Sequence, residues 1–151
     1  MNITLSSLFL SQIKEKNSML NDWRMYTDAS GQDQNHMGWH EVLKEIAQLN
    51  GTSRTLVHAA YGDHVDLVVA GGNQGQILVQ WKEHEPEARH YVLTADKPAG
   101  TMSTLTIEGA DVSFPASWCI ELEQAIPVLG DLLRTCEKGE PSGLTWISVE
   151  M

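Results

Sequence analysis

Six histidines are the residues of this chain best suited to metal or acid–base chemistry: His36, His40, His58, His64, His84 and His90. His36 and His40 have the i, i+4 spacing that would place two ligands on one helix face, but Gly38 lies between them. The sequence contains no HExxH and no CxxC motif, and structural zinc sites need four ligands while catalytic sites usually need three. We therefore predict no metal site and interpret the histidines as surface or loop residues.

Other groups that act in catalysis lack the surroundings that catalysis requires. The glycine-rich stretch 70–75 (AGGNQG) has no Lys-Ser/Thr pair and precedes a strand pattern, so no helix N-terminus faces an anion there. Ser117 and Ser148 lie in no G-x-S-x-G elbow, and Cys119 has no adjacent base. We predict that the chain is not an enzyme and that it uses no cofactor.

Acidic side chains offer a binding chemistry instead. Glutamates alternate at strand spacing directly after Trp81 and would project from one face of an extended segment, and two aspartates flank a neighbouring turn. Tryptophan is enriched at binding hot spots, although core packing is the more frequent use of Trp81 and of Trp146. Solvated loop charges and an acidic docking patch both remain open. The candidate partner-binding residues are Asp63, Asp66, Trp81, Glu83, Glu85 and Glu87.

The overall charge favours a basic partner. Twenty acidic residues stand against ten Lys and Arg, which gives a formal net charge of −10. Such a surface repels nucleic acid phosphates and anionic membranes, and it steers a basic protein towards itself. Solubility alone is an equally good explanation of this charge. We expect no nucleic acid partner and no membrane partner.

Length and composition predict one globular domain over residues 1–151. Cys119 and Cys136 fall in one predicted helix about 25 Å apart, too far for a disulfide, and are expected to be buried or half-buried thiols. No apolar run is long enough to span a membrane, and the N-terminus does not resemble a signal peptide. These features together predict a cytoplasmic protein.

Two helices are predicted to position the polar residues. Residues 38–50 carry apolar side chains at helical spacing and end at Asn50-Gly51. Residues 116–138 carry a longer apolar stripe that continues across Pro127, which favours one kinked helix over two helices. Residues 1–37 are poorly determined: 1–13 fit either a short helix or an edge strand at 1–5, and 27–37 are expected to form a surface loop.

Strand patterns fill the space between the helices. Runs of β-branched and aromatic residues, separated by turn residues, cover 55–61, 65–70, 76–81, 88–94 and 102–108, and residues 111–114 and 144–149 follow the same pattern. The short connections imply antiparallel pairing. We therefore predict an α+β fold with an antiparallel sheet of about five to six strands, a short helix before it and a long helix packed on one face.

Two segments carry a family resemblance. The first is VDLVVAGGNQGQILVQW over 65–81, a hairpin around a small polar turn, and the second is an Ala-to-Leu helix followed by a Gly/Pro turn and Leu144-Thr145-Trp146. Together they resemble the Imm1 family of immunity proteins from bacterial polymorphic toxin systems, over residues 38–149.

The resemblance implies a function by inhibition. Members of that family bind a cognate toxin, often a nucleic-acid-modifying enzyme such as a deaminase, and block its active site or substrate groove. The resemblance assigns no catalytic residues and no contact residues to this chain. The alternative hypothesis is an acidic secretion chaperone for an exported effector, because such chaperones are also small α+β proteins.

Overall fold

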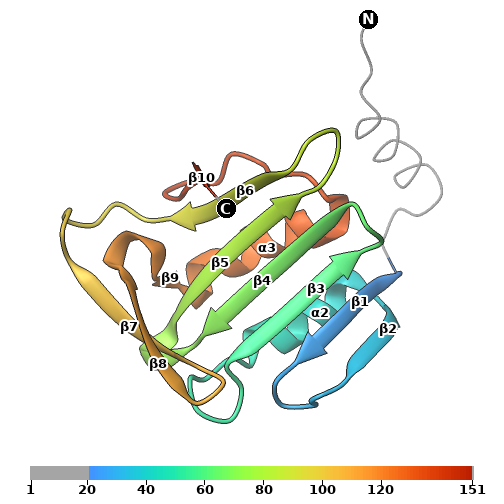
Figure 1. The fold of residues 1–151 in the computed structure, drawn as a ribbon, viewed down its shortest axis with the longest axis horizontal. Coiled ribbons are helices and arrows are strands. Elements are labelled where there is room, and N and C mark those ends of the chain that lie inside the picture. Colours follow the sequence, from blue (N-terminus) through green and yellow to red (C-terminus); the bar gives the residue numbers. More distant parts are fainter. Residues whose placement is uncertain (1–20, 151) are drawn as a thin grey trace, which may run out of the picture.

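A computed structural model describes residues 21–150 of the chain. The two alternatives for residues 1–13, a short helix or an edge strand, therefore lie outside the described residues. Among residues 21–150, the chain forms one large sheet, two α-helices and a separate two-stranded hairpin (Figure 1).

The large sheet is antiparallel throughout and has eight strands. Seven of them follow the order β10-β6-β5-β4-β3-β1-β2, and β9 pairs with one end of β5. Their bounds are β1 Trp23–Thr27, β2 Asp33–Met37, β3 Leu56–Tyr61, β4 Val65–Gly71, β5 Gln76–Glu83, β6 Arg89–Thr94, β9 Ile120–Glu121 and β10 Thr145–Val149. The remaining strands, β7 Met102–Ile107 and β8 Ala110–Pro115, pair only with each other.

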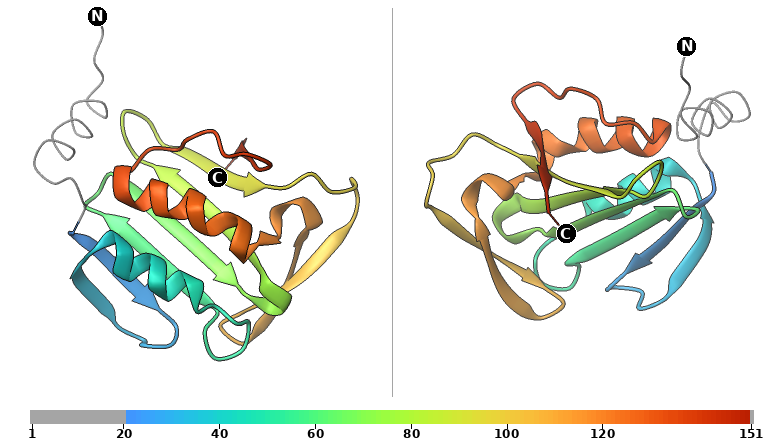
Figure 2. Two further views of the ribbon diagram at one scale, coloured as in Figure 1. Left: turned by 180° about the vertical axis from the view of Figure 1, so that it is seen from behind. Right: turned by 45° about the horizontal axis from the view of Figure 1, so that its top comes forward.

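Both α-helices cover the same face of the sheet. Helix α2 (Trp39–Ala47) and helix α3 (Leu122–Thr135) lie side by side behind the strands in Figure 1 and in front of them in the reversed view (Figure 2, left). Their apolar stripes meet the inward-pointing side chains of the central strands, and residues such as Ile46, Leu67 and Leu129 are fully buried between the two layers. Among residues 21–150, no helix covers the opposite face of β1, β3, β4 and β5.

The β4–β5 connection is built by backbone contact with the loop after α2. A methyl group at Gly72 would lie 2.5 Å from the backbone nitrogen of Asn50, and one at Gly51 would lie 2.7 Å from the backbone nitrogen of Asn73. Both glycines have positive φ, +107° and +75° respectively. Only glycine supplies this backbone conformation without steric conflict, so the two turns can pack directly against each other.

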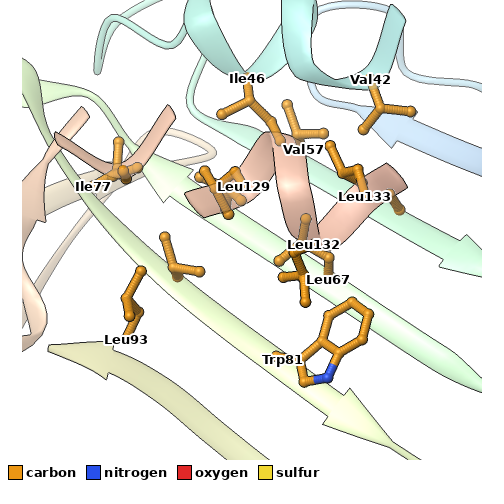
Figure 3. Close-up of a cluster of buried hydrophobic side chains, with 14 of the residues drawn as sticks. Val42, Ile46, Val57, Leu67, Ile77, Trp81, Leu93, Leu129, Leu132 and Leu133 are labelled. Carbon is orange, nitrogen blue, oxygen red and sulfur yellow. The ribbon is translucent and has the colours of Figure 1, made fainter. Parts of the chain in front are cut away.

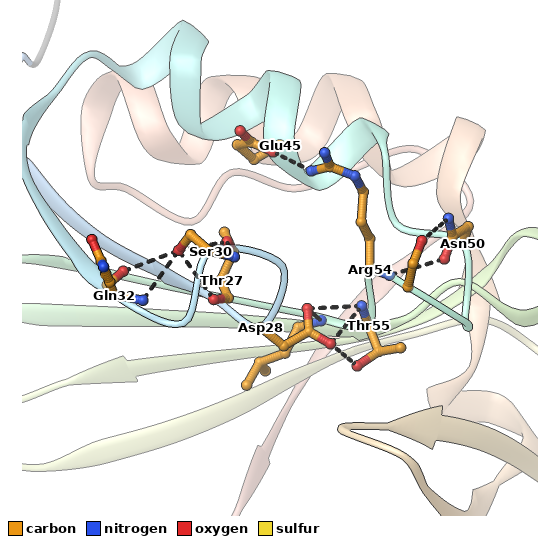
Figure 4. Close-up of polar contacts among 10 residues, drawn as sticks. Thr27, Asp28, Ser30, Gln32, Glu45, Asn50, Arg54 and Thr55 are labelled. Carbon is orange, nitrogen blue, oxygen red and sulfur yellow. Dashed lines mark hydrogen bonds and ion pairs between the residues drawn. The ribbon is translucent and has the colours of Figure 1, made fainter.

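One half-buried carboxylate joins the turn after β1 to β3. The carboxylate of Asp28 accepts hydrogen bonds from the Thr55 backbone N–H (3.0 and 3.1 Å), the Thr55 hydroxyl (2.5 Å) and the Leu56 backbone N–H (3.1 Å) (Figure 4). The same threonine hydroxyl accepts a bond from the Glu108 backbone N–H at 2.8 Å. Thr55 thus ties the turn after β1 and the β7–β8 hairpin to the start of β3.

The structure confirms the predicted α+β class, the antiparallel sheet and the two helices, and it shows more strands than the five to six expected. The predicted hairpin around 70–75 is present as β4 and β5, and residues 111–114 pair back on β7 within β8. The last strand, β10, lies at the sheet edge and pairs antiparallel to β6.

Two predicted segments differ from the structure. The expected surface loop over 27–37 contains β2, a polar edge strand that pairs with β1 around an irregular register. The long helix begins at Leu122 and not at 116, because residues 116–118 form a 3-10 turn and 120–121 pair with β5 as β9. Cys119 therefore lies before the helix and Cys136 at its C-terminal cap; both are buried thiols without a disulfide.

Candidate functional site: the acidic end of the sheet

Two turns meet at one end of the sheet and bring most of the candidate residues together. The register of β4 and β5 places Val65 opposite Glu83 and Asp66 opposite Lys82. The turn before β4 and the loop after β5 are therefore neighbours, and the His84 backbone N–H donates to the His64 carbonyl at 2.9 Å. We call the turn 62–64, the loop 84–88 and the adjoining residues Asp66 and Glu83 the acidic end.

Five of the six predicted residues belong to this acidic end: Asp63, Asp66, Glu83, Glu85 and Glu87. Asp63 and Glu87 are exposed, and the side chain of Glu85 is 41 % exposed. The predicted proximity of the aspartates to the glutamates is thus present, since residues from two separate connections share one end of the sheet.

Trp81 does not belong to this surface. Its side chain is fully buried against the helices, within the core cluster that includes Leu67 and Leu132 (Figure 3). Its indole N–H donates to the Glu83 carboxylate at 3.0 Å, which satisfies the only polar atom of the side chain. A buried side chain with a satisfied donor contacts no partner, so the inclusion of Trp81 among the partner-binding residues was wrong.

The three glutamates also do not share one strand face, as an extended segment would require. Strand β5 ends at Glu83, whose side chain lies on the same face as Trp81. Residues 84–88 then form a loop, in which Glu85 reaches the His64 imidazole at 2.9 Å and Glu87 pairs with Arg89. The end of β5 and the loop 84–88 bring the three glutamates into one region, and alternation along a single strand does not.

Asp66 has the most structured environment of the five carboxylates. It lies on the helix-free face of β4, where its oxygens contact His58 Nε2 at 3.0 Å and His84 Nε2 at 2.5 Å. Partial burial alone would raise the pKa of Asp66, but the hydrogen bonds from His84 and His58 and the charges of these imidazoles together lower it. Asp66 is therefore held as a carboxylate between two imidazoles.

These histidine–carboxylate contacts were not predicted from the sequence, which favoured surface or loop histidines over metal ligands. The β3–β4 hairpin register contains the information: Ala60 lies opposite Asp66, so His58 is its diagonal neighbour on the same face. That register follows from the turn at 62–64. The β4–β5 register gives the same information for His84, since Asp66 lies opposite Lys82 and His84 follows Lys82 by two residues on the same face. No strand register predicts the His64–Glu85 contact, because it joins two separate connections.

The acidic end has side chains that can bind a cationic partner. Among residues 21–150, no group of three or more His, Cys, Asp or Glu side chains has a geometry that could hold a metal ion. Within the same part of the chain, no helix is both long and apolar enough to cross a membrane. Half-exposed carboxylates held in fixed positions can form ion pairs and charge-assisted hydrogen bonds with Lys and Arg side chains.

A second polar pocket lies at the opposite end of the sheet, with a volume of about 580 Å³. Neutral amides and hydroxyls line it, and Asp111 is its one charged side chain. Several of these groups bond each other already: Asn73 exchanges two hydrogen bonds with Thr106, whose hydroxyl donates to Asp111 at 2.8 Å. Because its polar groups are largely satisfied, this pocket is a weaker candidate than the acidic end.

Comparison with known proteins adds no assignment to this geometry. The chain matches no protein-family model, and no curated protein is significantly similar to it in sequence.

Proposed function

We propose that this chain is an immunity protein that binds a basic toxin domain through the acidic end and occludes the toxin's active site. The observation that carries the proposal is the meeting of carboxylates from two separate turns at one end of a protein with a formal net charge of −10. The resemblance to the Imm1 family supports it. A cytoplasmic location, where such a toxin would act, is part of the same proposal.

The chemistry of the partner follows from the charge of the surface. Enzymes that modify nucleic acids have positively charged substrate grooves. An acidic surface that enters such a groove competes with the phosphates and gains from electrostatic steering during association. A stable inhibitory complex of this kind buries about 1,600 Å² in total. The exposed and half-exposed carboxylates of the acidic end would then form the charged part of a larger contact.

The test is neutralisation of the toxin domain encoded beside this gene. We expect co-expression with the wild-type chain to restore growth, and calorimetry to show binding below micromolar dissociation constants. Continued killing without measurable binding would refute the proposal. Binding only to an unfolded segment of the effector, by a dimeric form of this chain, would instead support the secretion chaperone.

Two matched double variants locate the interface. The first, Asp63→Lys with Glu87→Lys, reverses two exposed charges at the acidic end. The second, Asp96→Lys with Glu108→Lys, reverses two exposed charges at the opposite end and changes the net charge by the same amount. We expect the first variant to weaken toxin binding about 100-fold, a typical effect for charges within an interface, and the second to stay within about threefold. Equal effects would place the interface elsewhere.

A further inference from the structure

Imidazoles pair with the carboxylates of the acidic end. His58 and His84 each contact one oxygen of Asp66, at 3.0 and 2.5 Å, and His64 Nδ1 contacts the Glu85 carboxylate at 2.9 Å. A further pair, His36 with Asp22 at 2.6 Å, lies at the same end, where both residues line a pocket with Asp63. Four of the six histidines of the chain therefore contact carboxylates in one region.

These pairs connect elements that are otherwise joined only by the sheet. His58 belongs to β3, Asp66 to β4 and His84 to the loop after β5, while His64 and Glu85 join the turn before β4 to that same loop. The imidazoles are partly open to water, with side-chain exposures of 44 % for His58, 30 % for His64 and 38 % for His84. Solvent protons and a docking partner can both reach them.

We propose that the acidic end is a proton-sensitive docking surface, on which protonation of His58, His64 and His84 weakens the binding of a cationic partner. Histidine is the side chain that ordinarily changes charge between pH 5 and 8. Each added proton places a positive charge within hydrogen-bond distance of Asp66 or Glu85 and cancels part of the charge that attracts the partner. An incoming Lys or Arg must then displace an imidazolium from its carboxylate.

The other charged groups around the histidines do not oppose this effect. Carboxylate, lysine and arginine side chains ordinarily keep their charges between about pH 5.5 and 8. His90 faces the same side of the sheet beside Lys82, but burial first, and the Lys82 charge second, lower its pKa, so it takes up a proton less readily than an ordinary histidine. The charged neighbours at this end are Asp22, Arg24, Asp33, Asp63, Lys82, Glu83, Glu87 and Arg89, and the titratable Tyr26 lies opposite His58.

This inference rests on the proposed function for its partner, but its test does not need the toxin. The probe is an oligolysine peptide of about eight residues, titrated into the isotope-labelled chain at about pH 8 and about pH 5.8. At the higher pH we expect amide shift changes concentrated in residues 62–66 and 83–89. At the lower pH we expect the affinity to fall about tenfold, since three new positive charges each weaken the attraction modestly at a solvated surface.

The triple variant His58→Gln, His64→Gln and His84→Gln removes the three titrating groups and retains amide donors for the carboxylates. We expect its affinity for the peptide to change less than about threefold between the two pH values, because only His36 remains of the four histidines paired with carboxylates at this end. The matched control is His40→Gln, since His40 is exposed, packs edge-on against Trp39 and pairs with no carboxylate of residues 21–150; it should retain the wild-type pH dependence.

Three results would overturn the inference: the same pH dependence in the triple variant, no pH dependence in the wild type, or shift changes confined to another part of the surface. These outcomes are separate from a failure of the proposed function. A chain that neutralises the toxin but binds oligolysine independently of pH retains its function and loses the proton sensitivity. A chain that fails to neutralise the toxin but binds the peptide with the expected pH dependence retains the proton sensitivity and loses the proposed function.

Discussion

At the scale of single residues, Asp28 shows how one carboxylate stabilises the start of the sheet. Its pKa would rise through partial burial, but hydrogen bonds from the Thr55 hydroxyl and from the backbone N–H groups of Thr55 and Leu56 lower it. A carboxyl whose pKa is lowered on folding stabilises the fold above its ordinary pKa near 3.8, and this contribution is lost as the pH falls below that value.

We therefore expect Asp28→Asn to lower the free energy of unfolding by about 1–3 kcal/mol at neutral pH, the usual effect of removing a charged acceptor from buried donors. The difference from wild type should shrink as the pH falls below the ordinary carboxyl pKa of 3.8. Urea unfolding at a series of pH values measures it, with the exposed loop variant Asp96→Asn as control. A difference that stays constant down to pH 2 would contradict the assignment.

The two thiols give a second residue-scale prediction. Burial raises the pKa of Cys136 to about 12, with a smaller contribution from Glu137, and burial also raises the pKa of Cys119 despite Lys97 and Ser103 nearby. Because only a thiolate reacts readily, neither cysteine should react with a thiol reagent at pH 8 at more than a small fraction of the rate seen in denaturant. Rapid labelling of the folded chain would show that the caps and turns around these residues open easily.

At the scale of elements, the packing of the two glycine turns determines how β4 and β5 connect. Gly72→Ala would place a methyl group against the Asn50 and Gly51 backbone, whereas Gly100→Ala also has positive φ, +84°, but meets nothing within 4 Å. Backbone strain alone costs about 1–3 kcal/mol. Gly100→Ala therefore measures the cost of the strain, and Gly72→Ala measures the strain together with the steric conflict. We expect Gly72→Ala to destabilise the fold by more than about 3 kcal/mol beyond Gly100→Ala. Equal melting temperatures for both variants would contradict direct backbone packing.

The elements that followed from the sequence are those whose local patterns agree with their tertiary setting. The β4–β5 hairpin has apolar runs and a glycine turn, and α2 has an apolar stripe, so both were predictable. Strand β2 reads DQNHM, has no apolar alternation, and forms only because β1 offers an edge. Residues 120–121 fit a helix pattern, but pairing with β5 overrides it. The His64–Glu85 pair joins two separate connections, depends on the assembled sheet and had no local pattern.

At the scale of the whole molecule, the question is whether the net charge or its placement governs association. The field of a molecule with a net charge of −10 reaches about 8 Å at physiological salt, so all surface carboxylates contribute at long range. Once the two proteins are in contact, only the carboxylates that lie next to the partner still contribute to the attraction. The two double variants proposed above carry the same net charge and differ only in where the charge lies, so they separate these two contributions.

With the cognate toxin, we expect the wild-type association rate constant to approach about 10⁸ M⁻¹s⁻¹ at low salt and to fall at least about tenfold at 0.5 M salt. The far-end variant Asp96→Lys with Glu108→Lys should lose a little of the low-salt rate and keep its salt dependence. The acidic-end variant Asp63→Lys with Glu87→Lys should lose most of both, because the charges that remain near the partner at contact are reversed. Stopped-flow association across a salt series measures these rates. If the association rate constants of both variants depend on salt in the same way, net charge alone steers the encounter, and the meeting of the two turns does not contribute to it.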